Sequence, residues 1–197
     1  MFDKPRNQKR VNGHLVFALQ FLRHPRQIGS IIPSSVFLER RVIAAADIAA
    51  ANVVVELGPG TGGMTQAMLK VLPPRARLLS IEINPHFHAL VSRIRDDRLI
   101  PHLGSAAGIQ EIAAAHGLGR PDAIVSGIPF STMSPELGSQ ILARASAFLA
   151  ESGRFVAYQL NPRVAALGRP FLGAPEIDTE LLNLPPMRVF RWAKSAT

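Results

Sequence analysis

The feature that most constrains the fold of this 197-residue chain is an alternation of short apolar runs with longer helical segments. The apolar runs are rich in Val, Ile and Leu and predict strands at residues 53–57, 78–83, 123–126 and 155–158, with a weaker candidate at 99–102. Helices are predicted at residues 35–51, 61–71, 85–94, 107–116 and 135–149. Because near-continuous apolar strands are typical of a parallel sheet buried on both faces, the alternation predicts a doubly wound α/β fold.

Two further strand-like runs follow near the C-terminus, at residues 176–184 and 188–193, and only a short link joins them. Strands joined by so short a link pair antiparallel, so one terminal strand must run against the others. We therefore expect a mostly parallel, seven-stranded sheet with an antiparallel last strand, preceded by N-terminal helices.

Composition excludes several classes of protein. Apolar residues make up 47% of the chain and charged residues 18%, which excludes disorder and coiled coil. The absence of cysteine excludes disulfides, thiolate zinc sites, iron–sulfur clusters and thiol nucleophiles. No apolar run approaches the roughly 18 residues that a membrane span needs. The six histidines have no metal-binding spacing with carboxylates, so we expect no metal.

The net charge of +8 is concentrated at the two ends of the chain. Residues 1–41 carry eight Lys or Arg and two Asp or Glu, residues 42–187 carry eleven and twelve, and the last ten residues carry three and none. Basic ends around a neutral body predict a polyanionic partner, either nucleic acid or an anionic lipid surface. Composition alone does not choose between these two partners.

The basic N-terminal segment is also amphipathic. On a helical wheel Val11, Leu15 and Leu22 lie on one side, opposite Lys9 and Arg23. This pattern is typical of a helix lying in a membrane interface, and equally of a helix packed on its own domain. We therefore divide the chain into residues 1–34, for membrane docking or active-site cover, and a domain at residues 35–197. The basic and apolar opening has no small-residue cleavage site, so we expect a cytoplasmic protein.

A glycine-rich loop follows the first predicted strand and leads into a helix. Glycines let the backbone turn sharply and approach a ligand closely, and a helix N-terminus offers free N–H groups. Gly58, Gly60 and Gly63 fit the dinucleotide-binding pattern. Glu56, Gly58, Gly60 and Gly62 fit an acidic-x-Gly-x-Gly-x-Gly pattern, which resembles class I S-adenosyl-L-methionine methyltransferases of Rossmann-like fold. Glu56 would repel a pyrophosphate but suits a sulfonium and an ammonium, which favours the methyltransferase.

This resemblance implies a set of residues that bind S-adenosyl-L-methionine. Glu82 ends the second strand, 24 positions after Gly58, where a carboxylate can accept both ribose hydroxyls. Ile83 would cover the adenine, and Ser105 stands where the family often places an acidic residue. The implied cofactor-binding residues are Glu56, Gly58, Gly60, Thr61, Gly62, Glu82, Ile83, Ser105, Ala106 and Ser126.

The acceptor site is expected at the end of the fourth strand. Adenine N6-methyltransferases have an Asn/Asp-x-Pro-aromatic element there, which holds the target amine and stacks on the base. The matching positions are Gly127, Ile128, Pro129 and Phe130. Phe130 could stack, but Gly127 has no side chain to hold an amine, which argues against an rRNA adenine substrate. We also expect no room for the helical C-terminal domain of those rRNA enzymes.

A second resemblance extends over most of the chain. The segment at residues 21–35, the glycine loop, residues 126–129 and the ending at residues 183–190 resemble bacterial phospholipid N-methyltransferases of the short, soluble, rRNA-dimethylase-like type. The resemblance implies stepwise methylation of phosphatidylethanolamine toward phosphatidylcholine by a protein bound peripherally to the anionic inner membrane. The implied substrate-binding residues are Ile31, Pro33, Ser34, Ser35, Pro129, Phe130, Tyr158 and Asn161.

Tyr158 and Ser126 are the candidate catalytic residues. Tyr158 is the only tyrosine and ends the fifth strand, so we hypothesise that it orients the headgroup or takes part in proton transfer. The alternative is a tyrosine that simply packs on the sheet. For Ser34 and Ser35, helix capping is favoured over substrate contact.

Two other functions stay open at this level. One is an rRNA or DNA adenine N6-methyltransferase that grips phosphates with its basic ends. The other is a membrane-surface binding module that keeps the cofactor loop without catalysis.

Overall fold

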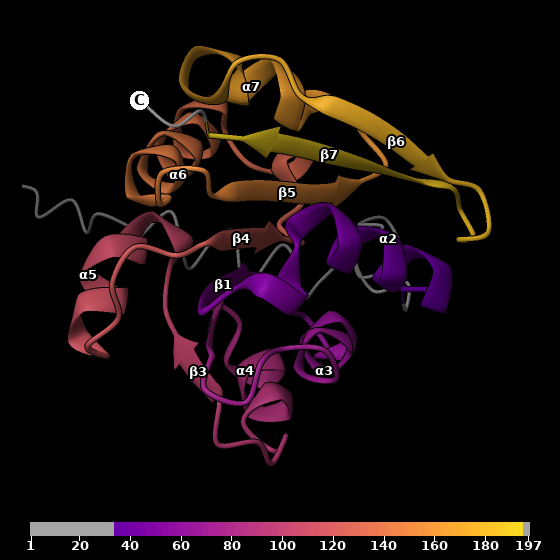
Figure 1. Cartoon of the computed structure of the whole chain (residues 1–197). Helices are drawn as coiled ribbons and strands as arrows, with labels where there is room; N and C mark the ends of the chain where they lie inside the picture. The colour runs from indigo at the N-terminus through magenta and orange to yellow at the C-terminus, as the bar shows by residue number, and fades with distance from the viewer. Residues whose placement is uncertain (1–33, 195–197) are drawn as a thin grey trace, which may run out of the picture.

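The computed structural model describes residues 34–194, which form one sheet with helices on both faces (Figure 1). The N-terminal segment, with the candidate contacts Ile31 and Pro33, therefore lies outside the described residues. The strands are β1 (Val53–Leu57), β2 (Arg77–Glu82), β3 (Leu99–Leu103), β4 (Ala123–Ser126), β5 (Arg154–Gln159), β6 (Glu176–Glu180) and β7 (Met187–Ala193). Their order across the sheet is β3-β2-β1-β4-β5-β7-β6.

The predicted topology is confirmed. Strands β1 to β5 pair in parallel, and β7 runs antiparallel to both β5 and β6. Since β6 is antiparallel to β7, it points in the same direction as β1 and β5. The carboxyl ends of β1, β4, β5 and β6 therefore lie at one edge of the sheet, where doubly wound folds bind their ligands.

Within residues 34–194, three α-helices cover each face of the sheet. One face carries α2 (Val36–Ala46), α3 (Gly63–Leu69) and α4 (Pro85–Val91), and the other carries α5 (Ile109–Ala115), α6 (Pro135–Phe148) and α7 (Arg163–Leu172). Successive residues of a strand face opposite sides, so Val54 packs in the α2 core and Val55 in the α6 core. Burial on both faces explains why the central strands are almost continuously apolar.

Several element bounds differ from the sequence-based expectations. The first helix ends at Ala46, because Asp47 adopts a left-handed conformation with φ 54° before the short 3-10 turn at Ile48–Ala50. Strand β6 ends at Glu180, since the following leucines form the turn into β7. Helix α7 was not predicted from the sequence, because its ten residues include Pro170 and follow Pro162.

Over residues 34–194, none of the helices has the length and apolar character that crossing a bilayer demands.

Candidate functional site

The glycine loop after β1 is shaped by three residues with positive φ angles. Gly58, Gly60 and Gly62 have φ values of 73°, 57° and 87°, a region that residues with side chains rarely adopt. A Cβ atom on Gly58 would lie 3.1 Å from Cγ1 of Ile128, so this glycine also permits close packing against the end of β4. A Cβ atom on Gly60 would meet nothing within 4 Å. The loop therefore packs tightly against the end of β4 at Gly58, whereas the space beside Gly60 holds no other protein atoms.

Glu56 is fully buried beneath this loop. Its Oε2 accepts hydrogen bonds from the hydroxyls of Thr65 and Ser80, both at 2.7 Å. Its Oε1 has no hydrogen-bond partner among the described residues. Burial raises the pKa of Glu56 to about 7, the two hydroxyls oppose the shift, and the charge of Glu82 adds to it. A buried acceptor without a partner suits a cationic ligand, so Glu56 fits the predicted sulfonium cofactor.

Glu82 lies at the end of β2 and faces the same loop. Its two carboxylate oxygens accept backbone N–H groups, Oε2 from Gly60 at 3.1 Å and Oε1 from Asn84 at 2.8 Å. Burial raises the pKa of Glu82, and the backbone N–H groups oppose that shift. The N–H groups fix the orientation of the carboxylate, and each oxygen keeps a lone pair for a ribose hydroxyl.

The remaining predicted cofactor residues lie at the ends of neighbouring strands. Thr61 is exposed in the loop, and Ile83 is half-buried directly after Glu82. Ser105 caps a short 3-10 turn by accepting the N–H of Ala107 at 3.3 Å, and Ala106 is buried. The structure thus brings these residues to one edge of the sheet, next to Glu82.

The side chain of Tyr158 lies against the backbone of Gly127, at the ends of β5 and β4. A Cβ atom on Gly127 would lie 2.6 Å from the Tyr158 hydroxyl oxygen and 2.7 Å from the carbonyl oxygen of Gly58. The tyrosine hydroxyl therefore stands where a side chain at position 127 would begin. Burial raises the pKa of Tyr158, and the carboxylates of Glu56 and Glu39 raise it further. The phenol therefore stays protonated at neutral pH.

Glu39 is a candidate site residue that the sequence analysis missed. Helix α2 carries it to the start of α3, where its Oε1 lies 3.9 Å from the Cβ position of Gly63. Burial raises the pKa of Glu39, and Lys70 opposes the shift. Acidic residues are common in the first turn of a helix because the positive end of the helix dipole stabilises them. The position of Glu39 in the sequence therefore does not distinguish a functional residue from a structural one.

The other predicted site residues have identifiable local contacts. The hydroxyl of Ser35 accepts the N–H of Leu38 at 3.2 Å, which confirms its predicted capping role. Ser126 is buried and accepts the N–H of Ile128 at 3.3 Å. Asn161 is exposed and accepts the N–H of Arg163 at 2.9 Å. Ser34 and Pro129 are half-buried.

Phe130 differs from its expected role. Its side chain is fully buried in the core beneath α6 and α7, so in this conformation it offers no open face for stacking. The ring packs in that core instead, with Met133 among its neighbours, because the 3-10 turn at Phe130–Thr132 directs it inward. No signal in the sequence separates an inward from an outward phenylalanine at this turn.

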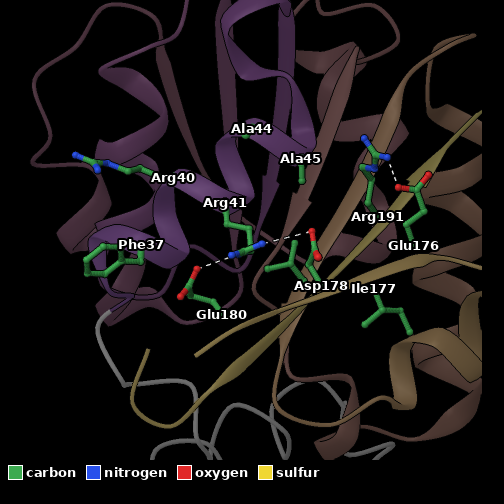
Figure 2. A pocket seen from close by; sticks show the side chains of 11 residues that line it. Phe37, Arg40, Arg41, Ala44, Ala45, Glu176, Ile177, Asp178, Glu180 and Arg191 are labelled. Carbon is green, nitrogen blue, oxygen red and sulfur yellow. Dashed lines mark hydrogen bonds and ion pairs between the residues drawn. The ribbon is translucent and has the colours of Figure 1, made fainter. Parts of the chain in front are cut away.

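A groove of about 640 Å³ lies elsewhere, between α2 and the strands β6 and β7 (Figure 2). Five of its charged groups pair with one another: Arg41 contacts Glu180 at 2.9 Å and Asp178 at 3.5 Å, and Arg191 contacts Glu176. None of the glycine-loop residues lines this groove, so it is distinct from the site described above. Across residues 34–194 there is no group of three or more His, Asp or Glu that could hold a metal ion.

Together, the sheet order, the glycine loop and the two buried carboxylates define a class I S-adenosylmethionine-dependent methyltransferase. Solved structures of this class share the fold. The O-methyltransferase TomG from Streptomyces achromogenes matches with a TM-score of 0.69 at 15% identity, over 97% of this chain and 93% of that one. A 1,6-didemethyltoxoflavin N1-methyltransferase from Burkholderia thailandensis matches with a TM-score of 0.67 at 17% identity, over 98% and 93%. No protein-family model matches the chain.

Sequence comparison gives the family. The chain is 30% identical over 174 residues to an ornithine lipid N-methyltransferase from Singulisphaera acidiphila, which covers 87% of this chain and 91% of the relative. The chain belongs to the family of that ornithine lipid N-methyltransferase. It is also 34% identical over 104 residues to the ribosomal RNA small subunit methyltransferase A of Phenylobacterium zucineum, but this match covers only 34% of that protein. The predicted cofactor, S-adenosylmethionine, is confirmed.

Proposed function

We propose that this protein transfers methyl groups to the headgroup amine of a membrane amino lipid, namely phosphatidylethanolamine, stepwise toward phosphatidylcholine. The observation that carries the proposal is the shared space of Gly127 and Tyr158. With the Tyr158 hydroxyl 2.6 Å from the Cβ position, an Asn or Asp side chain does not fit at 127 without displacing the tyrosine. The end of β4 therefore lacks the group that adenine N6-methyltransferases use to hold their target amine.

The extent of the sequence matches supports a lipid acceptor. The lipid-methylating relative matches along 91% of its length, whereas the rRNA-methylating relative matches along 34%. Ornithine lipid and phosphatidylethanolamine both offer a primary amine in a headgroup, so the shared chemistry is methylation of a lipid-borne amine. In this proposal residues 1–34 dock the enzyme peripherally on the inner membrane from the cytoplasmic side, as their charge pattern suggests.

The described residues suggest how the acceptor amine is held. When bound, S-adenosylmethionine supplies an electrophilic methyl group on a sulfonium. An alkylammonium has a pKa near ~10.4, so the headgroup must give up a proton to solvent water before its nitrogen can attack. The Tyr158 phenol is neutral at pH 7, and its oxygen can accept an N–H of the amine and so direct the nitrogen lone pair. Glu39 and Glu56 place negative charge near this hydroxyl, which favours a cationic headgroup there.

The test uses the full chain with methyl-labelled S-adenosylmethionine and several acceptors offered in parallel. These are phosphatidylethanolamine vesicles with anionic lipid, ornithine lipid vesicles with anionic lipid, and naked ribosomal RNA. Label in phosphatidylethanolamine supports the proposal, and the Glu82→Gln variant serves as a control with a weakened cofactor site. Label in ornithine lipid alone would change the substrate to another amino lipid, and label in RNA alone would overturn the proposal.

The second candidate is an rRNA adenine N6-methyltransferase, which the identity to ribosomal RNA methyltransferases over half of the chain favours. The RNA arm of the same experiment tests it. A non-catalytic membrane-binding module would instead bind the cofactor and label none of the acceptors.

A further inference from the structure

The turn between β6 and β7 carries three leucines that are mostly exposed. The exposed fractions are 73% for Leu181, 64% for Leu182 and 87% for Leu184. The side chains of these leucines are therefore largely in contact with solvent, although burying a leucine is worth about 2 kcal/mol. Exposed apolar residues that cluster in this way mark a contact surface for another molecule.

This turn is held in a defined place beside the start of α2. The side chain of Asn183 is buried, and its Oδ1 accepts the N–H of Ser35 at 2.8 Å. The Nδ2 of Asn183 donates to the carbonyl of Pro185 at 2.9 Å, which braces the turn from within. Arg41 on α2 bonds Glu180 at the end of β6. The leucines are therefore presented by an anchored turn.

The start of α2 adds two more exposed apolar side chains, Val36 at 56% and Phe37 at 49%. We call the five side chains that are exposed here the leucine rim: Val36, Phe37, Leu181, Leu182 and Leu184. Figure 1 shows the turn after β6 and the start of α2 on the same side of the molecule, and the bond between Ser35 and Asn183 joins them.

The leucine rim lies at the edge of the sheet that carries the candidate active site. Strand β6 is parallel to β1 and β5, so the turn that follows Glu180 lies at the same edge as the glycine loop and Tyr158. A long-chain lipid whose headgroup amine reaches Tyr158 must extend out of the protein from this edge. The rim is thus next to the place where the acyl chains would leave the site.

Exposed arginines flank the rim, and the nearest carboxylate, that of Glu180, is paired. Arg188 is exposed on β7 just after the turn, and residues 181–188 contain no Asp or Glu, whereas Arg191 lies farther along β7 and is paired with Glu176. Arg40 is exposed on α2, and the carboxylate of Glu180, which precedes the rim, is bonded to Arg41. Apolar side chains flanked by arginine are the chemistry that binds an anionic membrane interface.

We propose that the leucine rim inserts into the interface of an anionic membrane and so aligns the site with the lipid headgroups. This inference rests on the proposed function and adds a second docking surface, within the folded domain. It commits to a lipid surface as the partner, because a membrane offers both acyl chains for the leucines and anionic headgroups for the arginines.

The absence of cysteine makes a direct test available. The full chain with Leu182→Cys carries a single thiol, which is labelled with the polarity-sensitive fluorophore NBD. Vesicles of phosphatidylglycerol and phosphatidylcholine should shift the emission to the blue and increase its intensity about twofold, as expected for a probe that enters the apolar boundary. The matched control is Ala115→Cys, exposed at the end of α5. An unchanged emission at position 182, or equal changes at both positions, would overturn the proposal.

If the rim binds something other than a membrane, the same fluorescence assay gives a different result. If residues 1–33 or a second copy of the chain cover the rim, iodide will fail to quench the label at position 182 before vesicles are added. If ribosomal RNA shifts the emission and vesicles do not, the partner is nucleic acid. Either result overturns the membrane proposal.

A substrate comparison separates this proposal from the proposed function. Changing all three leucines to serine (Leu181→Ser, Leu182→Ser, Leu184→Ser) should lower methyl transfer to vesicle phosphatidylethanolamine about tenfold, through weaker partitioning. Transfer to dihexanoyl phosphatidylethanolamine, which is soluble without a bilayer, should stay unchanged. Equal losses on both substrates would overturn the role of the rim. If the unaltered protein methylates neither lipid, the proposed function fails, whereas the NBD experiment still decides whether the rim enters membranes.

Discussion

The hydroxyl oxygen of Tyr158 lies 2.6 Å from the position that a Cβ atom on Gly127 would occupy. The two residues end neighbouring strands and are 31 positions apart in the sequence, so only the pairing of β4 with β5 brings them together. The carbonyl oxygen of Gly58 approaches the same point to 2.7 Å. The candidate acceptor site is therefore built around a position where a side chain would collide with its surroundings.

We expect Gly127→Ala to destabilise the fold and to lower methyl transfer. The added methyl group collides with a backbone carbonyl as well as with the tyrosine, and overpacking of this kind costs about 1–3 kcal/mol. Thermal and urea unfolding measure the loss. Gly119→Ala is the matched control, since a Cβ atom there meets nothing within 4 Å. Adding Tyr158→Phe should recover part of the loss, and a double mutant no more stable than Gly127→Ala would contradict the proposed clash.

Removing the hydroxyl alone tests the role of Tyr158. We expect Tyr158→Phe to lower turnover on a lipid amine about tenfold, on the scale of one hydrogen bond, because the nucleophile loses its orienting partner. The dissociation constant for S-adenosylmethionine, measured by calorimetry, should change little. If turnover is unaffected, Tyr158 only packs on the sheet.

The buried carboxyl of Glu56 makes stability depend on pH. Its folded pKa of about 7 lies above the ordinary value of 4.5, so the protonated form favours the folded state. This contribution is fully present below pH 4.5 and is lost as the pH rises through 7. Relative to Glu56→Gln, the free energy of unfolding should fall by about 3 kcal/mol from pH 4.5 to 8. Urea titrations of both proteins measure the difference, and parallel curves would refute it.

Glu82 should contribute to cofactor affinity. Replacing its carboxylate by an amide in Glu82→Gln removes a charged acceptor and should raise the dissociation constant for S-adenosylmethionine about 10- to 100-fold. Calorimetry with S-adenosylhomocysteine, which lacks the sulfonium charge, should give a similar ratio if ribose binding is the cause. The control is Glu111→Gln, on the surface of α5, where affinity should be unchanged.

Asn183 should stabilise the turn after β6. Asn183→Ala leaves the N–H of Ser35 and the carbonyl of Pro185 without their side-chain partner, which should cost about 1–3 kcal/mol. Chemical unfolding measures this loss against Gln140→Ala, an exposed position on α6. Faster hydrogen exchange at residues 181–186 should accompany the loss, and a cost no larger than that of the control would show that the turn does not depend on Asn183.

Much of the fold follows from local pattern. The apolar runs and their spacing were enough to predict the strands and the antiparallel β7, because a buried strand must be apolar along its own length. The glycine loop is also predictable from the local sequence, because its positive φ angles require glycine whatever the surrounding structure is. Helix α7 is not predicted because Pro162, Gly168 and Pro170 weaken its intrinsic helix preference, and packing against α6 overrides that preference.

The sequence by itself determined the sheet, the loop and the carboxylates at the ends of β1 and β2. The tertiary structure alone decided that Glu39 reaches the start of α3, that Phe130 turns into the core, and that Tyr158 fills the space of a missing side chain. It also decided where the leucine rim lies, through a bond between residues 148 positions apart. Periodicity along a chain records whether each residue is buried, whereas contacts between distant segments depend on how the finished elements pack together.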